Sequence, residues 1–137
     1  MKEMSMTELE QFAAHHIERF RAGGDLFFPL LEADDAIVPI LIEACKAEPD
    51  PEVRAALVEV IWQHRLPETV AFLSEALADN APEVWKNALD GLVALGGESA
   101  IKALESVKEQ VLAHRQGTPD QAEWIDEAIQ QIKEDQV

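Results

Sequence analysis

Apolar residues recur with the period of an α-helix along most of the chain. One such stripe is formed by Val53, Leu57, Val60 and Ile61, which stand at i, i+4, i+7 and i+8. No stretch alternates as a half-buried strand does, so the pattern predicts an all-α protein. The expected helices cover residues 6–22, 35–47, 51–65, 67–79, 82–95, 98–115 and 119–135, and residues 26–32 predict a turn or a short helix.

The helical pattern repeats along the chain. The segment Pro51–Arg54 recurs 31 residues later as Pro82–Trp85, and a step of 37 leads from Pro82 to Pro119. Proline is favoured in the first turn of a helix, so each of these prolines is expected to begin one. Repeating helix pairs stack on their neighbours and need end caps. We therefore predict a single domain with an N-terminal cap (1–34), repeats (35–115) and a C-terminal capping helix (116–137).

Two segments carry a family resemblance. Residues 36–44 (AIVPILIEA) followed by 49–57 (PDPEVRAAL) resemble a HEAT-type repeat over residues 35 to about 108. The resemblance implies a short right-handed α-solenoid of antiparallel helix pairs, about seven helices in all, that serves as a binding scaffold. It also implies a polar ladder built from Asp50 and Arg54. The second unit departs from the pattern, because Ala81 and Trp85 stand at the equivalent positions.

Charge narrows the possible partners. The 137 residues carry a formal net charge of −16, and residues 25–50 hold seven acids against the single Lys46. Such a surface repels phosphates and anionic lipids, which argues against direct nucleic-acid or membrane binding. The longest apolar run, residues 36–42, is far shorter than the roughly 20 residues that a membrane-spanning helix needs. Without a signal-like N-terminus, and with Cys45 as the only cysteine, the chain is predicted to be cytoplasmic.

Candidate catalytic and metal-binding groups are sparse. Neither a His-Glu-x-x-His nor a Glu-x-x-His spacing surrounds the four histidines, which are expected to be exposed at helix ends. They are His15, His16, His64 and His114. Cys45 has no flanking cation to lower its pKa and is interpreted as a small core residue. Phosphate-binding and nucleophile-elbow motifs are also missing, so the sequence predicts no enzyme, no catalytic residue, no metal and no cofactor.

The repeat places three carboxylates at equivalent positions. Glu59, Asp90 and Glu127 would lie on successive second helices, about 8–10 Å apart, and form an acidic row on the concave face. Asn87 and Trp85 are expected to join this partner-binding surface. Two alternatives stay open: the row is ordinary solvated surface, and Trp85 packs against a neighbouring helix instead of being exposed. Trp62 and Trp124 are expected to pack between helices.

Three functions follow as hypotheses. The first is a non-enzymatic module whose acidic concave face binds a basic partner protein, with an immunity or inhibitor protein as its narrower form. The second is a scaffold or assembly factor, a monomer or weak dimer, that acts through apolar helix edges such as residues 27–31. The third is an enzyme akin to HEAT-like lyases or DNA glycosylases, which conflicts with the charge and would need an exposed Cys45 thiol of lowered pKa.

Overall fold

The fold is entirely helical in the residues that the structure, a computed structural model, describes: 4–24, 27–114 and 119–135. In chain order the helices are α1 (Met6–Arg21), α2 (Phe27–Glu32), α3 (Val38–Ala47), α4 (Pro51–Gln63), α5 (Val70–Ala76), α6 (Pro82–Leu95), α7 (Gly97–His114) and α8 (Pro119–Asp135). Short 3₁₀ turns, Asp35–Ile37 and Pro67–Thr69, lead into α3 and α5. The predicted all-α class is confirmed, and α2 occupies the stretch predicted as a turn or short helix.

The helix boundaries follow local sequence signals. Pro51 and Pro82 begin α4 and α6, as the repeat predicted. Asp50 caps α4, because its carboxylate accepts the backbone N–H of Glu52 at 2.9 Å. Helix α6 ends at Gly96, whose φ of +62° lies in the left-handed region that glycine adopts without steric cost.

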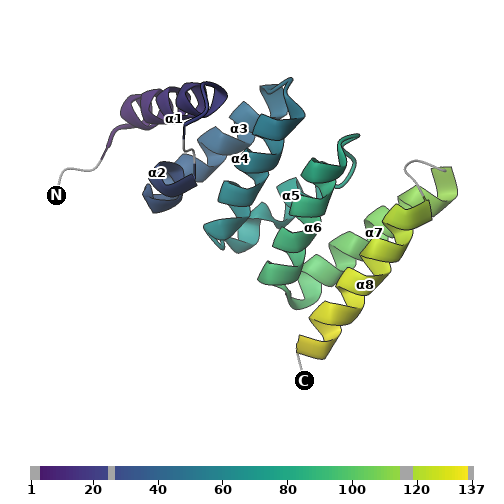
Figure 1. Ribbon diagram of the computed structural model, residues 1–137. Helices are drawn as coiled ribbons and strands as arrows, with labels where there is room; N and C mark the ends of the chain where they lie inside the picture. The colour runs from purple at the N-terminus through teal and green to yellow at the C-terminus, as the bar shows by residue number, and fades with distance from the viewer. Residues whose placement is uncertain (1–3, 25–26, 115–118, 136–137) are drawn as a thin grey trace.

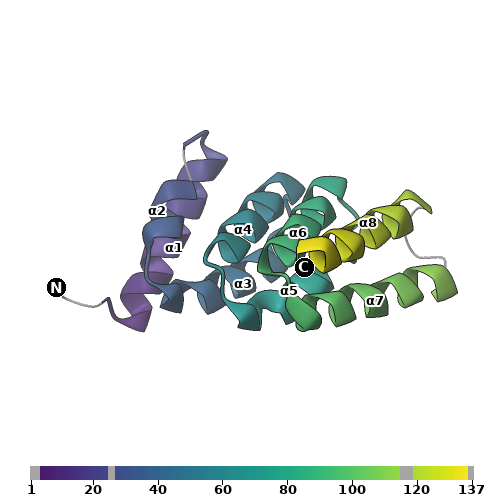
Figure 2. The ribbon, with the colours of Figure 1, turned by 90° about the horizontal axis from the view of Figure 1, so that it is seen from below.

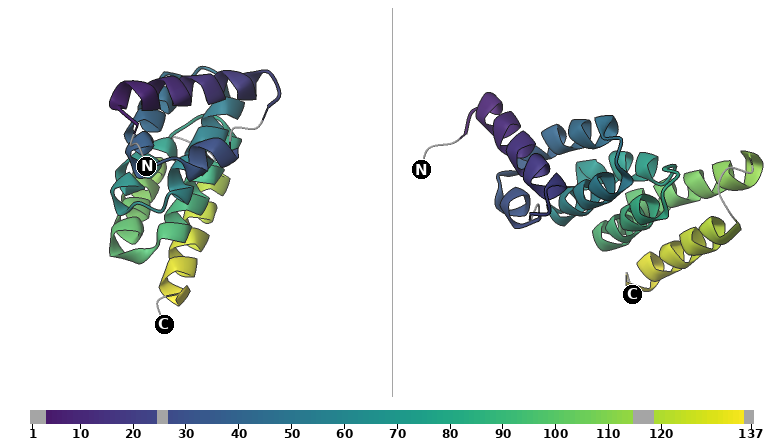
Figure 3. Two further views of the ribbon diagram at one scale, coloured as in Figure 1. Left: turned by 90° about the vertical axis from the view of Figure 1, so that its left-hand side faces the viewer. Right: turned by 45° about the horizontal axis from the view of Figure 1, so that its top comes forward.

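The helix pairs stack into two layers (Figure 1). Helices α3, α5 and α7 form one layer, which we call the first helices, and α4, α6 and α8 form the other, the second helices (Figure 2). Helix α4 packs on α6, and α6 packs on α8. Helix α1 lies across the N-terminal end of the stack (Figure 3), in contact with α3, while α2 contacts α4. The result is a short α-solenoid of antiparallel helix pairs.

The two layers differ in spacing. Between α4 and α6 there is no room for a side chain at Gly91, since a Cβ there would lie 2.7 Å from the Cβ of Trp62. On the side of the first helices, surface grooves of about 360 Å³ and 420 Å³ lie between α3 and α5 and between α5 and α7, and one of about 290 Å³ separates α3 from α1. The second helices α4 and α6 are therefore closer together than the first helices α3 and α5, while α5 on α7 and α6 on α8 pack to a similar extent.

The core runs through the whole stack and includes a residue that the sequence suggested would be exposed. Leu30 of α2 is fully buried, while Pro29 and Leu31 are half-buried. The apolar patch expected at 27–31 is therefore corrected at Leu30, because α2 packs as a helix on α4. The side chains of residues 27 and 28 lie outside the described residues.

His64 also departs from its predicted exposure. Its side chain is 2% exposed, with Nδ1 2.9 Å from Asp35 Oδ1 and Nε2 2.9 Å from the Leu30 carbonyl oxygen. Both partners of the ring are oxygen atoms, one of a carboxylate and one of a backbone carbonyl. The end of α4 is thereby tied to α2 and to the turn before α3. Of the other histidines, His15 is exposed but lies within α1 and not at its end, His16 beside it is half-buried, and the side chain of His114 lies outside the described residues.

Candidate protein-binding face

The second helices turn a polar stripe away from the core. On α4, for example, buried and half-buried residues occupy most of the circumference, and Glu52 is the exposed residue of the helix. We call the corresponding surface of the three helices the second-helix face. It consists of Glu52, Ala56, Glu59 and Gln63 of α4, Glu83, Lys86, Asn87 and Asp90 of α6, and Trp124, Glu127 and Gln131 of α8.

The three carboxylates of the predicted row all belong to this face. Glu59 is half-buried, whereas Asp90 and Glu127 are exposed. They lie at equivalent positions of helices that are neighbours in the stack. Although much of Asp90 is exposed, the protein atoms around its carboxyl group desolvate it and raise its pKa above the ordinary value. Binding through this row stays a prediction.

The second-helix face and the layer of first helices differ in their distribution of charges. Lys86 is the single cation of the second-helix face as defined, against five acids. The first helices mix both signs, since Lys46, Lys102 and Lys108 stand among their glutamates. Lys46 lies 3.9 Å from carboxylate oxygens of Glu43 and Glu75. The acidic excess is thus more one-sided on the second-helix face.

Two tryptophans meet at the junction of α6 and α8. Trp85 is only 8% exposed, so of its two alternatives packing against a neighbouring helix is the one found. Trp124 is 42% exposed, and its expected packing between helices is wrong. The ring centroids lie 6.0 Å apart at an interplanar angle of 85°, an edge-to-face contact. The Lys86 ammonium lies 4.7 Å from the Trp124 ring centroid and 5.6 Å from that of Trp85. We call these three residues the tryptophan corner.

The exposure of Trp124 follows from its place in the repeat. The step of 37 residues relates Trp124 to Asn87, a half-buried residue whose side-chain amide donates to the Glu83 carbonyl at 3.4 Å. That step was visible in the sequence and could have predicted an outward indole. Trp62, by contrast, packs on Gly91 between α4 and α6, as predicted.

Buried contacts hold the turn of α8 that carries Trp124. One turn earlier, the side-chain amide of the buried Gln121 donates to the Leu77 carbonyl at 2.8 Å. The next residue after Trp124, Ile125, is fully buried. Because its neighbours on both sides are anchored, the exposed indole stands on a rigid helix instead of a loop.

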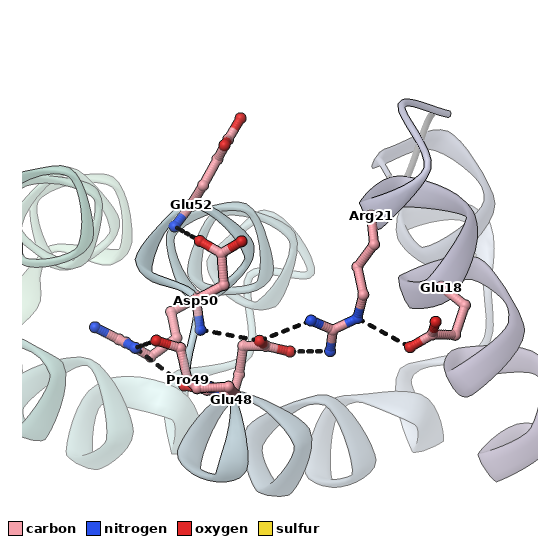
Figure 4. Close-up of polar contacts among 7 residues, drawn as sticks. Glu18, Arg21, Glu48, Pro49, Asp50 and Glu52 are labelled. Atoms are coloured by element: carbon pink, nitrogen blue, oxygen red, sulfur yellow. Dashed lines mark hydrogen bonds and ion pairs between the residues drawn. The ribbon is translucent and has the colours of Figure 1, made fainter.

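A ladder of charged side chains joins the units at one edge of the stack. Arg21, in the last turn of α1, forms two parallel hydrogen bonds with the carboxylate of the buried Glu48, one of them 2.9 Å from Nη1 to Oε2, and donates from Nε to Glu18 at 2.9 Å (Figure 4). The backbone N–H of Asp50 donates to the same Glu48 carboxylate at 3.0 Å. These donors, with Arg21 first, hold the pKa of Glu48 below its ordinary value despite burial.

The next step of the ladder repeats this arrangement. Arg54 donates to both carboxylate oxygens of Asp79, at 2.9 and 3.1 Å, and to the carbonyl oxygens of Glu48 and Pro49, at 3.0 and 2.9 Å. The backbone N–H of Ala81 donates to Asp79 at 2.9 Å. The ladder acids are therefore Glu48 and Asp79, which are 31 residues apart, and the prediction that Asp50 is one of them is corrected: Asp50 caps α4.

The arrangement of the candidate nucleophile Cys45 and of the possible metal ligands gives no support to catalysis in the described residues. Cys45 is buried, and burial raises the pKa of its thiol to about 11, so the thiolate that a nucleophile requires is disfavoured. This is the opposite of the exposed, acidic thiol that the enzyme hypothesis needed. In the part of the chain that the structure describes, no group of three His, Cys, Asp or Glu side chains could hold a metal ion, and no helix is both long and apolar enough to cross a membrane.

Comparison with protein families gives a match over about half of the chain. The family model described as HEAT repeats matches residues 38–110, which span α3 to most of α7. Comparisons with curated proteins and with solved structures found no match.

Proposed function

Because the chain belongs to the HEAT repeat family, whose members generally act as protein-interaction modules, we propose that it is a non-enzymatic module that binds a basic protein through its second-helix face. The observation that carries this proposal is the set of five carboxylates on that face against the single Lys86. Opposite charge would steer a cationic partner to the face and select it over neutral proteins.

The spacing of the layers also supports the proposal. Helices α4 and α6 are packed closely, whereas a groove separates α3 from α5, and such a difference in spacing bends a stack toward the second-helix side. Curvature of that sense would bring the carboxylates of neighbouring helices toward a common partner. Solenoid repeats commonly bind on such a surface.

We further propose, as a narrower form, an inhibitor or immunity protein that neutralises a basic toxin in the cytoplasm. Its support is the acidic net charge of −16 together with a small size and a single buried cysteine. The scaffold alternative has less support, because Leu30, one of the residues of its apolar patch, is buried.

The test is charge reversal on matched faces. In Glu59→Lys with Asp90→Lys, we expect affinity for a nonameric oligolysine peptide to fall about tenfold at low salt, with a shallower salt dependence. The control is Glu43→Lys with Glu105→Lys, an identical change of net charge on exposed residues of α3 and α7. Equal losses in the two variants would show that only net charge matters and would overturn the assignment to the second-helix face.

A further inference from the structure

We propose that the tryptophan corner is the seat for an arginine side chain of the basic partner, and that Lys86 occupies this seat until the arginine displaces it. This inference rests on the proposed function and adds a chemical identity to one anchor of the partner. It concerns the indole face of Trp124, which is distinct from the acidic row.

Trp124 is exposed although its helix holds it in place. An indole that is 42% exposed on a rigid helix leaves apolar surface in water, although the fold has placed its other tryptophans at helix junctions. Tryptophan is among the residues that dominate the binding energy of protein interfaces, particularly when it is held in one orientation. Trp85 and the anchored turn of α8 hold Trp124 in this way.

Lys86 lies over the rings of both tryptophans. Its ammonium group lies close to both rings, which shows that the corner already attracts a cation. A lysine ammonium is strongly hydrated, whereas a guanidinium is planar, more weakly hydrated and stacks well on an aromatic face. An arginine of the partner would therefore bind the rings more favourably than Lys86 does, and would displace it.

Carboxylates share helix faces with the residues of the tryptophan corner. Glu127 follows Trp124 by three residues and Asp90 follows Lys86 by four, so each carboxylate shares a helix face with a member of the corner. A guanidinium stacked on Trp124 would have carboxylates nearby to accept its N–H groups. An uncharged apolar side chain would gain nothing from these carboxylates, and they therefore favour arginine as the occupant.

The experiment compares two charge-matched peptides, nonameric oligoarginine and nonameric oligolysine, by fluorescence anisotropy. Wild-type protein should bind oligoarginine about two- to fivefold more tightly than the Trp124→Ala variant does. The wild-type preference for oligoarginine over oligolysine should be lost in that variant. Trp124→Phe should keep part of the preference. Urea unfolding of each variant verifies that the fold is intact, and an unchanged preference in Trp124→Ala would overturn the proposal.

Lys86 supplies a second measurement that does not depend on removing an aromatic residue. We expect Lys86→Ala to bind oligoarginine more tightly, and by a larger factor than Lys133→Ala, which removes the same charge from an exposed residue near the end of α8. Equal gains in the two variants would mean that Lys86 acts only through net charge, which would overturn its role as occupant of the seat.

The outcomes separate this inference from the proposed function. If both peptides bind equally, and Glu59→Lys with Asp90→Lys weakens both, the acidic face stands and the arginine seat is wrong. If neither peptide binds wild-type protein at low salt, both proposals are wrong. Sedimentation adds one more outcome: self-association that Trp124→Ala abolishes would identify a second copy of the chain as the occupant and would also overturn the arginine seat.

Discussion

The junction of α4 with α6 and the junction of α6 with α8 use the same repeat position in opposite ways. Arg54 and Trp85 are equivalent residues, 31 apart. Arg54 has a structural role, because its hydrogen bonds go to Asp79 and to backbone carbonyls within the ladder. Trp85 forms the floor of an aromatic corner whose outer member faces solvent. One repeat position thus stabilises the stack in one unit and shapes a surface in the next.

The difference has a physical cause. A partly buried guanidinium is tolerated only where carboxylates and carbonyls receive its N–H groups, and Asp79 stands where Arg54 needs it. An indole needs mainly apolar contact. At the second junction, the buried hydrogen bond from Gln121 to Leu77 and the core residues of α8 join the units instead. Variants of the ladder should therefore reduce stability while changing peptide affinity no more than charge-matched controls do.

The largest effect is expected from breaking the ladder at Arg54. Arg54→Ala leaves the carboxylate of Asp79 partly buried without its guanidinium, so the free energy of unfolding should fall by about 2–3 kcal/mol. Urea unfolding measures the loss, and Arg19→Ala, on an exposed position of α1, is the control. Oligoarginine affinity should change no more than it does in this control, which removes the same charge. A stability loss no larger than that of the control would show that the ladder does not join the units.

A smaller effect, of about 1 kcal/mol at neutral pH, is expected for Glu48→Gln. The folded-state pKa of Glu48 is lowered, so its contribution is complete above the ordinary pKa of the carboxyl group and is lost as the pH falls through the lowered value. The difference from wild type in urea unfolding should therefore shrink in acid. Glu18→Gln is the matched control, because Glu18 bonds to the same guanidinium from an exposed position. A difference that grows in acid would contradict the assignment.

The smallest effect on stability, and of opposite sign, is expected for Asp90→Asn. Desolvation raises the folded-state pKa of Asp90, so ionisation at neutral pH disfavours the folded state. The neutral amide should leave stability equal or higher by a few tenths of a kcal/mol, while weakening peptide binding. Glu127→Gln removes the same charge from an exposed residue and should weaken binding without the gain in stability. If Asp90→Asn destabilised the fold, Asp90 would be a structural residue.

Much of the fold was predictable because the repeat is written in local patterns. The predicted helix over 82–95 coincides with α6, and the one over 119–135 coincides with α8. The signals that define α6 are local: a proline at its start and the helical spacing of Val84, Ala88 and Leu92. Such signals can be recognised from residues that are close together in the sequence. The shared position of Glu59, Asp90 and Glu127 on the second helices follows from the same period.

The partners of individual side chains were less accessible. The step of 31 residues relates Glu48 to Asp79, and the step of 37 relates Trp124 to Asn87, but neither step says which side chain lies opposite. His64 was expected to be exposed because its helix ends there, yet α2 covers it. Such burial depends on where a separate element packs.

The sequence by itself determined the helices, their pairing into repeats and the excess of acidic residues, because hydrophobic period, prolines and charge are properties of the chain. Only the tertiary structure decided that Arg54 meets Asp79, that Trp124 stays half in solvent and that Lys86 rests on its ring. These contacts join residues from different helices, and they exist only once the stack has set the distance and angle between neighbours.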